Sequence, residues 1–171
     1  MDENQEDLLP RLLNVFEVDD LHARRHFVCF LETSLAEQRG IDPRAIVGEF
    51  KPGPDQEFVI DSFTVNPGFV EALTGYMNHE ATRSADLIAE GLRSPGSWLY
   101  VLDPRYEGST TDDPPAGELL GCYEVDGSGA IVAGSFLYNE NHQLFEPDRG
   151  VSALLLDRRF YEWLHEVEPS D

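Results

Sequence analysis

The chain has 171 residues, of which 41% are hydrophobic, so it is long enough for one domain with a sizeable core and is not a disordered protein by composition. It carries 33 acidic and 12 basic residues, which gives a formal net charge of −21. A surface this negative repels DNA, RNA and anionic membranes and attracts basic partners or metal cations. We therefore expect no direct binding to nucleic acid or to membranes, and a basic protein as the partner.

The acidity also has explanations that involve no partner. Acidic residues keep a protein soluble, and an excess of Asp and Glu with a single lysine, Lys51, also suits a cytoplasm rich in salt. The scarcity of lysine also follows from a GC-rich genome. The net charge is −9 over Met1–Ala85 and −12 over Asp86–Asp171. The negative charge is thus a property of the whole surface and not of one acidic tail.

The N-terminus and the cysteines predict a reduced, cytoplasmic protein. The first residues, MDENQEDLLP, lack the basic stretch of a secretion signal, and no apolar run reaches the ~18 residues of a membrane span. Cys29 and Cys122 lie in apolar segments without CxxC spacing, which indicates buried thiols rather than a disulfide or a zinc cluster.

Two helices are predicted at the start of the chain. Apolar residues at helical spacing predict the first helix over Glu6–Val18, although Pro10 indicates a start near Leu9. A second helix is predicted over Leu21–Arg39, and Gly40 can end it in the left-handed conformation. We expect these helices to pack as an antiparallel pair.

From Ala45 onward the pattern alternates between strands and helices. The elements expected, in chain order, are strands over Ala45–Phe50 and Gln56–Val65, helices from Pro67 and over Thr82–Leu92, strands over Ser97–Asp103, Glu118–Val125, Ala130–Tyr138 and Val151–Asp157, and a helix over Arg158–Val167. Asp126–Gly129, DGSG, has the composition of a hairpin turn. The chain is therefore predicted to be a single α+β domain over residues 1–171. Its mainly antiparallel sheet, of about five to seven strands, is expected to pack against N-terminal, middle and C-terminal helices.

The segment Tyr138–His142, YNENH, has two interpretations. Glu140 and His142 would act as a general base or as metal ligands if they converged with Asp103 or His79. The Asn-Glu-Asn sequence also suits the connection between two strands, with His142 at the start of the second. We favour the turn, and expect both side chains to lie at a surface position that the fold does not need. Glu140, His142, Asp103 and His79 remain the catalytic candidates of an alternative, hydrolase-like enzyme.

Other pairs of reactive residues have simpler structural explanations. His22 and His26 have the spacing of zinc-binding helices, but Ala23 stands where the HExxH motif has its glutamate, and two arginines lie between the histidines. Cys29 lies three residues after His26 among apolar neighbours that favour burial. The sequence has no phosphate-binding glycine loop, no GxSxG elbow and no EF-hand loop. We expect neither a metal nor a cofactor.

An acidic loop is the candidate binding site. From Asp103 to Asp126 there are seven acidic residues and one basic residue, Arg105. An acidic loop stiffened by prolines can present carboxylates to the arginines and lysines of a partner, although it could equally be a solvated connection. The candidate binding residues are Tyr106, Glu107, Asp112, Asp113 and Glu118.

The function expected from these features is that of an acidic binding or inhibitor module acting on a basic protein partner. It would be of the immunity or antitoxin kind, and mimicry of DNA charge is its extreme form. The alternatives are the small enzyme described above and an acidity that reflects only adaptation to salt. The sequence does not define an oligomeric state.

Overall fold

The computed structural model of the chain describes residues 14–20, 23–29, 37–38, 40–56, 58–103, 106, 113–146, 150–151 and 158–166. These residues form helices and antiparallel sheets, which confirms the predicted α+β class. The chain divides into two compact units, which are described one after the other. Unit 1 comprises Met1–Val70, Phe145–Val151 and Leu155–Asp171, and unit 2 comprises Glu71–Leu144 and Ser152–Leu154. This division does not test the single domain expected over residues 1–171, which stays a prediction.

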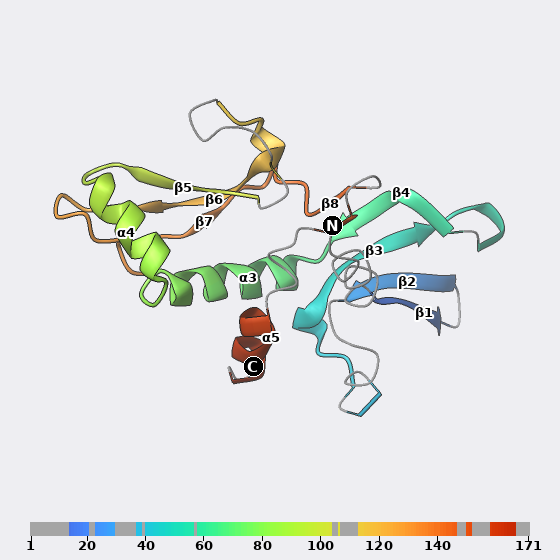
Figure 1. Ribbon diagram of the computed structural model, residues 1–171. Helices are drawn as coiled ribbons and strands as arrows, with labels where there is room; N and C mark the ends of the chain where they lie inside the picture. Colours follow the sequence, from blue (N-terminus) through green and yellow to red (C-terminus); the bar gives the residue numbers. More distant parts are fainter. Residues whose placement is uncertain are drawn as a thin grey trace, which may run out of the picture. The chain divides into compact units, whose positions relative to one another are not determined.

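Unit 1 contains a four-stranded antiparallel sheet in the order β1-β2-β3-β4 (Figure 1). Its strands are β1 (Asn14–Asp20), β2 (Ala23–Cys29), β3 (Ile46–Pro52) and β4 (Phe58–Val65). The sequence predicted β3 and β4, and the short 3-10 helix η2 (Pro54–Gln56) lies between them, in and just after the predicted turn. Unit 1 also holds strands β8 (Phe145–Glu146) and β9 (Gly150–Val151), helix α5 (Arg158–Glu166) and the first residues of helix α3 (Pro67–Glu80).

The first two strands correct the predicted pair of N-terminal helices. Asn14–Val18 belongs to β1 and Ala23–Cys29 forms β2, whereas Glu37 and Gln38 are helical. The other residues of the two predicted helices lie outside the described part of the chain. A short apolar run fits the helical and the strand period alike, and pairing with distant strands decides between them. Here β2 pairs with β1 on one side and with β3 on the other, which local sequence does not reveal.

Aromatic rings make up much of the core of unit 1. The rings of Phe50, Phe63 and Phe145 lie 5.0 to 5.3 Å apart and join β3 and β4 to β8. Phe69 at the start of α3 contacts Phe160 of α5, with 5.9 Å between the ring centroids, and both side chains are fully buried. Ring pairs at such distances add to the stabilisation that burial alone provides.

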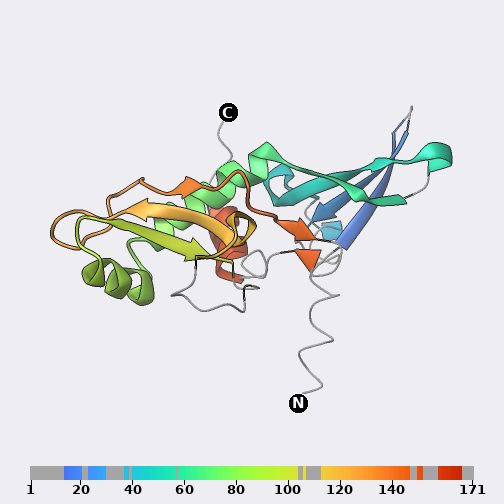
Figure 2. The same cartoon turned by 90° about the horizontal axis from the view of Figure 1, so that it is seen from above.

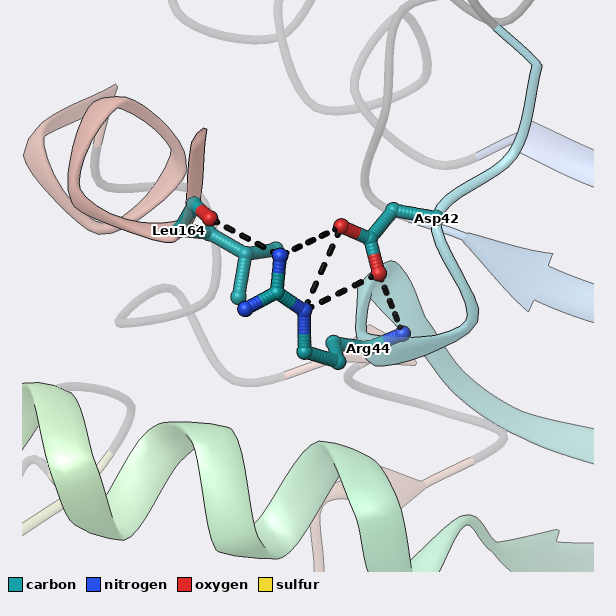
Figure 3. Close-up of polar contacts among 3 residues, drawn as sticks. All are labelled: Asp42, Arg44 and Leu164. Atoms are coloured by element: carbon teal, nitrogen blue, oxygen red, sulfur yellow. Dashed lines mark hydrogen bonds and ion pairs between the residues drawn. The ribbon is translucent and has the colours of Figure 1, made fainter. Parts of the chain in front are cut away.

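An arginine fork ties the C-terminal helix to the segment before β3 (Figure 3). Asp42 caps the 3-10 helix η1 (Pro43–Ala45), and its carboxylate accepts hydrogen bonds from the backbone nitrogen and the guanidinium of Arg44 at 2.8 to 3.3 Å. The same guanidinium donates to the carbonyl oxygen of Leu164 at 3.1 Å. That carbonyl lies in the last turn of α5, where carbonyl groups have no partner within the helix.

Unit 2 is built on a three-stranded antiparallel sheet with α3 along one face (Figures 1 and 2). The elements are β5 (Trp98–Leu102), β6 (Leu119–Glu124), β7 (Leu137–Tyr138), α4 (Ala85–Arg93) and the part of α3 from Glu71. The hydroxyl of Tyr123 in β6 donates to the carbonyl oxygen of Met77 in α3 at 2.6 Å. The backbone nitrogen of Phe136 donates to the side-chain oxygen of Asn78 at 3.0 Å. Sheet and helix are therefore joined by polar contacts as well as by apolar packing.

One predicted strand of unit 2 is mostly absent. Asp126–Gly129 forms the expected turn, and Val125 pairs with Ile131 beyond it. The strand predicted over Ala130–Tyr138 is wrong up to Phe136, because the chain turns at Gly134, whose φ of +72° lies in the left-handed region. Only the last two residues of the predicted range form a strand, β7.

The described strands form sheets of four, three and two strands, so the single sheet of five to seven strands is not confirmed. The expected middle and C-terminal helices are present as α3, α4 and α5, with α4 capped by Ser84 rather than beginning at Thr82. Within the described residues, every helix is too short or too polar to cross a lipid bilayer.

Candidate functional site

Two of the predicted catalytic residues meet in the interior of unit 2. Asp103 directly follows β5 and His142 follows the turn after β7. His142 Nε2 lies 2.6 Å from Asp103 Oδ2, and both side chains are completely buried. The hydroxyl of Tyr138 lies 3.3 Å from His142 Nδ1, on the other side of the imidazole. The three side chains therefore form a line of carboxylate, imidazole and phenol.

Asn139 fixes the turn that presents His142. Its side-chain nitrogen donates to the carbonyl oxygens of Ala116 and Leu119, at 2.6 and 2.8 Å, and its side-chain oxygen accepts from the backbone nitrogen of Asn141. The backbone nitrogen of His142 donates to the carbonyl oxygen of Asn139 at 2.9 Å, which closes a four-residue turn. The predicted Asn-Glu-Asn turn is confirmed.

The surface position predicted for His142 is wrong, because the turn directs this side chain inward. Glu140 is exposed at the tip of the turn, as expected, while His142 is only 5% exposed. No strand begins at His142, since the next strand, β8, starts at Phe145. The pairing with Asp103, 39 positions earlier in the sequence, explains why a polar ring can be buried here.

The surroundings of Tyr138 favour the protonated form of its hydroxyl. Burial raises the pKa of Tyr138, and the nearby charge of Asp103 raises it further. With a neutral imidazole, the consistent arrangement has the phenol donating to His142 Nδ1 and His142 Nε2 donating to the carboxylate of Asp103. A histidine oriented in this way can hold or pass a proton, but with no exposed side-chain surface neither it nor Asp103 can touch a substrate.

The remaining catalytic candidates do not share this buried environment. Glu140 is exposed, and His79 is half-buried in the last turn of α3. Among the residues that the structure describes, no group of three or more His, Cys, Asp or Glu side chains could hold a metal ion. His26 lies on strand β2, not on a helix, and His22 is outside the described residues. Helical zinc spacing therefore does not apply at His26.

The predicted binding loop is described only in part. Tyr106 is half-buried and its backbone nitrogen donates to the carbonyl oxygen of Asp103 at 2.9 Å. Asp113 is exposed, and Glu118 is half-buried just before β6. Glu107 and Asp112 lie outside the described residues. Of the two candidate carboxylates that the structure describes, Asp113 is therefore the more exposed.

Two surface features were not anticipated from the sequence. Unit 1 has a cleft of about 280 Å³ lined in part by Arg25, Phe27, Glu49 and Asn66. The guanidinium of Arg25 lies 5.0 Å from the centre of the Phe27 ring and also pairs with Glu49, so this cleft presents an arginine whose charge is already compensated. In unit 2, one face of the sheet exposes large apolar side chains. The apolar composition of β5, WLYVL, was the available signal for this face, because a strand with one solvated face normally alternates with polar residues.

Comparisons of the chain with protein-family models, curated proteins and solved structures gave no match. The function is therefore inferred from the chain's own chemistry. The features that bear on function are the fully buried Asp103–His142 pair, the excess of exposed carboxylates and the apolar sheet face in unit 2.

Proposed function

We propose that the chain is an acidic binding or inhibitor module that acts on a basic protein partner. The observation that carries this proposal is the net charge of −21 together with where the charges lie. Exposed acidic side chains outnumber exposed basic ones in the described residues. The acidic ones are Glu37, Asp55, Asp61, Glu71, Asp86, Glu90, Asp113, Glu124, Asp126, Glu140, Glu162 and Glu166, and the basic ones are Arg25, Lys51, Arg83, Arg93 and Arg159.

Ion pairs reduce the available positive charge further. Arg25 pairs with Glu49, and Arg93 pairs with Glu90 one turn earlier on α4. The exposed carboxylates are spread over both units, so they produce a broad negative field. Such a field speeds the encounter with a positively charged protein and opposes encounters with nucleic acid.

The enzyme alternative has weaker support. A general base has to come within hydrogen-bond reach of a substrate, and the side chains of Asp103 and His142 have no exposed surface. A binding role needs no such opening. We further propose that the module is of the immunity or antitoxin kind and works in the cytoplasm, where the free thiols of Cys29 and Cys122 would stay reduced.

The proposal is tested by capture of the partner with matched charge variants. The loop variant replaces Glu107, Asp112, Asp113 and Glu118 with Gln or Asn. The control removes the same number of charges elsewhere, at Asp55, Asp61, Glu162 and Glu166, all exposed. We expect the native protein and the control to capture a basic protein from lysate of the source cell at ~0.1 M salt, and the loop variant to capture less.

The salt-adaptation alternative predicts a different outcome. In that case no basic protein is retained, and the native protein gains stability steadily as the salt concentration rises into the molar range, because screening relieves its self-repulsion. Equal capture by both variants would remove the loop from the proposal while leaving the charge argument intact.

A further inference from the structure

One face of the sheet in unit 2 is apolar and exposed. Trp98, Tyr100 and Leu137 are 46%, 61% and 58% exposed. In the strand register Tyr100 lies opposite Cys122, and Cys122 lies opposite Leu137, so these side chains share one face. Trp98 is two residues before Tyr100 and therefore points the same way. We call the surface formed by Trp98, Tyr100, Cys122 and Leu137 the outer face.

The other face of the same sheet is the one that is covered. Tyr123 points to it, is fully buried and is bonded to α3 through its hydroxyl. Phe136 is 3% exposed and its ring lies 4.9 Å from that of Tyr123. Unit 2 thus has its core on the α3 side. The solvated face of an antiparallel sheet is normally polar, so its apolar composition here needs an explanation.

Acidic residues border the outer face. Glu124 lies directly opposite Trp98 in the register and is exposed. Asp126 follows two residues later, also exposed, and hydrogen bonds from Ser128 and from the backbone of Ala130 lower the pKa of its carboxyl, which keeps the group charged. An apolar centre with a charged rim is the usual anatomy of a protein-binding surface.

The negative charge of the chain indicates which kind of molecule can bind to the outer face. A second copy of the chain would bring another net charge of −21 against this rim, which opposes self-association. A basic protein surface with apolar side chains at its centre fits both parts of the outer face. Its arginines would pair with Glu124 and Asp126 and could also stack on Trp98 or Tyr100, since a guanidinium is attracted to the face of an aromatic ring.

We propose that the outer face is the docking surface for a protein segment that carries apolar side chains flanked by arginine or lysine. This inference rests on the proposed function and adds the place and the chemistry of contact. Tryptophan and tyrosine at the centre of such a surface contribute much of the binding energy of protein complexes.

The experiment uses the full chain and three synthetic peptides of equal length. The first alternates arginine with leucine, the second contains only arginine and glycine, and the third alternates glutamate with leucine. The readouts are the dissociation constant from fluorescence anisotropy and the rate at which iodoacetamide alkylates Cys122, which lies half-exposed at the centre of the outer face. Cys29 is fully buried and serves as the internal reference for the alkylation.

We expect the arginine–leucine peptide to bind and to slow the alkylation of Cys122. The variant Trp98→Ser/Tyr100→Ser should weaken this binding at least about tenfold, as expected for central aromatic residues. The variant Ile88→Ser removes an exposed apolar side chain of α4, outside the sheet, and should leave binding unchanged. If the double variant melts early, Tyr100→Ser alone, at the most exposed of the three positions, replaces it.

Several results would overturn the inference about the outer face, and each can be told apart from the result that would reject the proposed function. Equal binding of the arginine–leucine and arginine–glycine peptides, without protection of Cys122, would mean that charge alone acts and that the outer face is no docking site. Dimerisation abolished by Trp98→Ser/Tyr100→Ser would make the face an interface between copies. Burial raises the pKa of Cys122 and slows its alkylation, so only a free-chain rate as low as that of the fully buried Cys29 would mean that another part of the chain covers it. If neither arginine peptide binds, the proposed function itself fails.

Discussion

At the scale of single residues, Asp103 and His142 form a fully buried polar pair, and the half-buried Tyr138 lies on the other side of the imidazole. A buried polar group is tolerated when its partner satisfies it, and becomes costly when the partner is removed. Asp103 and His142 are both buried and lie 2.6 Å apart, so removing either side chain alone should lower the free energy of unfolding.

His142→Ala should lower the free energy of unfolding by about 1–3 kcal/mol, because it leaves the Asp103 carboxyl buried without this partner. Glu140→Ala, two residues away at the exposed tip of the turn, should stay within about 0.5 kcal/mol of the native protein. Urea unfolding of both variants measures the difference. A His142→Ala protein as stable as Glu140→Ala would show that the buried pair does not support the fold.

Asp42 gives the chain a pH-dependent contribution to stability. The hydrogen bond from the Arg44 side chain holds the pKa of Asp42 below its usual value, and burial opposes this only in part. Because the folded pKa is lower than the unfolded one, the contribution is complete above the unfolded value of about 4 and is lost as the pH falls through the folded value.

The variant Asp42→Asn keeps a side chain that can cap η1 and removes the charge. Its unfolding free energy should therefore fall below that of the native protein by a constant amount from pH 6 to 8, and the gap should narrow below pH of about 4. Urea unfolding at a series of pH values tests this. A gap that does not change with acidification would contradict the link between the charge and Arg44.

At the scale of elements, the sequence was most informative where local chemistry decides. Helix α3 begins at Pro67 as predicted, and Asn66 just before it accepts from the backbone of Gly68. Helix α4 begins at Ala85 after its cap Ser84, and not at the predicted Thr82. Strands β3, β4, β5 and β6 lay close to the predicted ranges, because each is an apolar run bounded by turn residues.

Elements that depend on distant partners were not predictable in the same way. The segment that forms β1 and β2 has apolar spacing compatible with a helix, and becomes a hairpin because β3 is available to pair with it. The convergence of Asp103 with His142 is equally non-local, since 39 positions separate them and the turn that aims His142 is held by Asn139. Sequence pattern indicated the turn but not the direction of its last side chain.

Close contact between β6 and β7 makes one glycine indispensable to unit 2. A Cβ atom at Gly121 would collide with the carbonyl oxygen of Leu137 and with the ring of Phe136. Gly121→Ala should therefore lower the free energy of unfolding by about 1–3 kcal/mol, the usual cost of overpacking. Gly127→Ala is the control, because its Cβ would meet nothing within 4 Å. Thermal unfolding compares them, and equal stability of the two variants would mean that β7 can move away freely.

At the scale of the whole molecule, charge sets the behaviour. A net charge of −21 on 171 residues gives a self-repulsion that salt relieves and that a basic partner would neutralise. Exposed charges add little to folding stability but change the rate at which partners meet. The acidity should therefore appear more strongly in association kinetics than in the melting temperature.

The role of the acidic surface is tested most directly by the rate constant with which the chain associates with the captured basic partner. Stopped-flow fluorescence measures this rate over a range of ionic strength. For the native chain we predict a rate that falls steeply as salt rises from ~0.05 to ~0.5 M, because screening shortens the reach of the negative field to a few ångströms. The loop variant, with Glu107, Asp112, Asp113 and Glu118 neutralised, should associate more slowly at low salt and show a flatter dependence. A rate that is the same for both proteins and independent of salt would contradict the claim that this chain recognises its partner through its acidic surface.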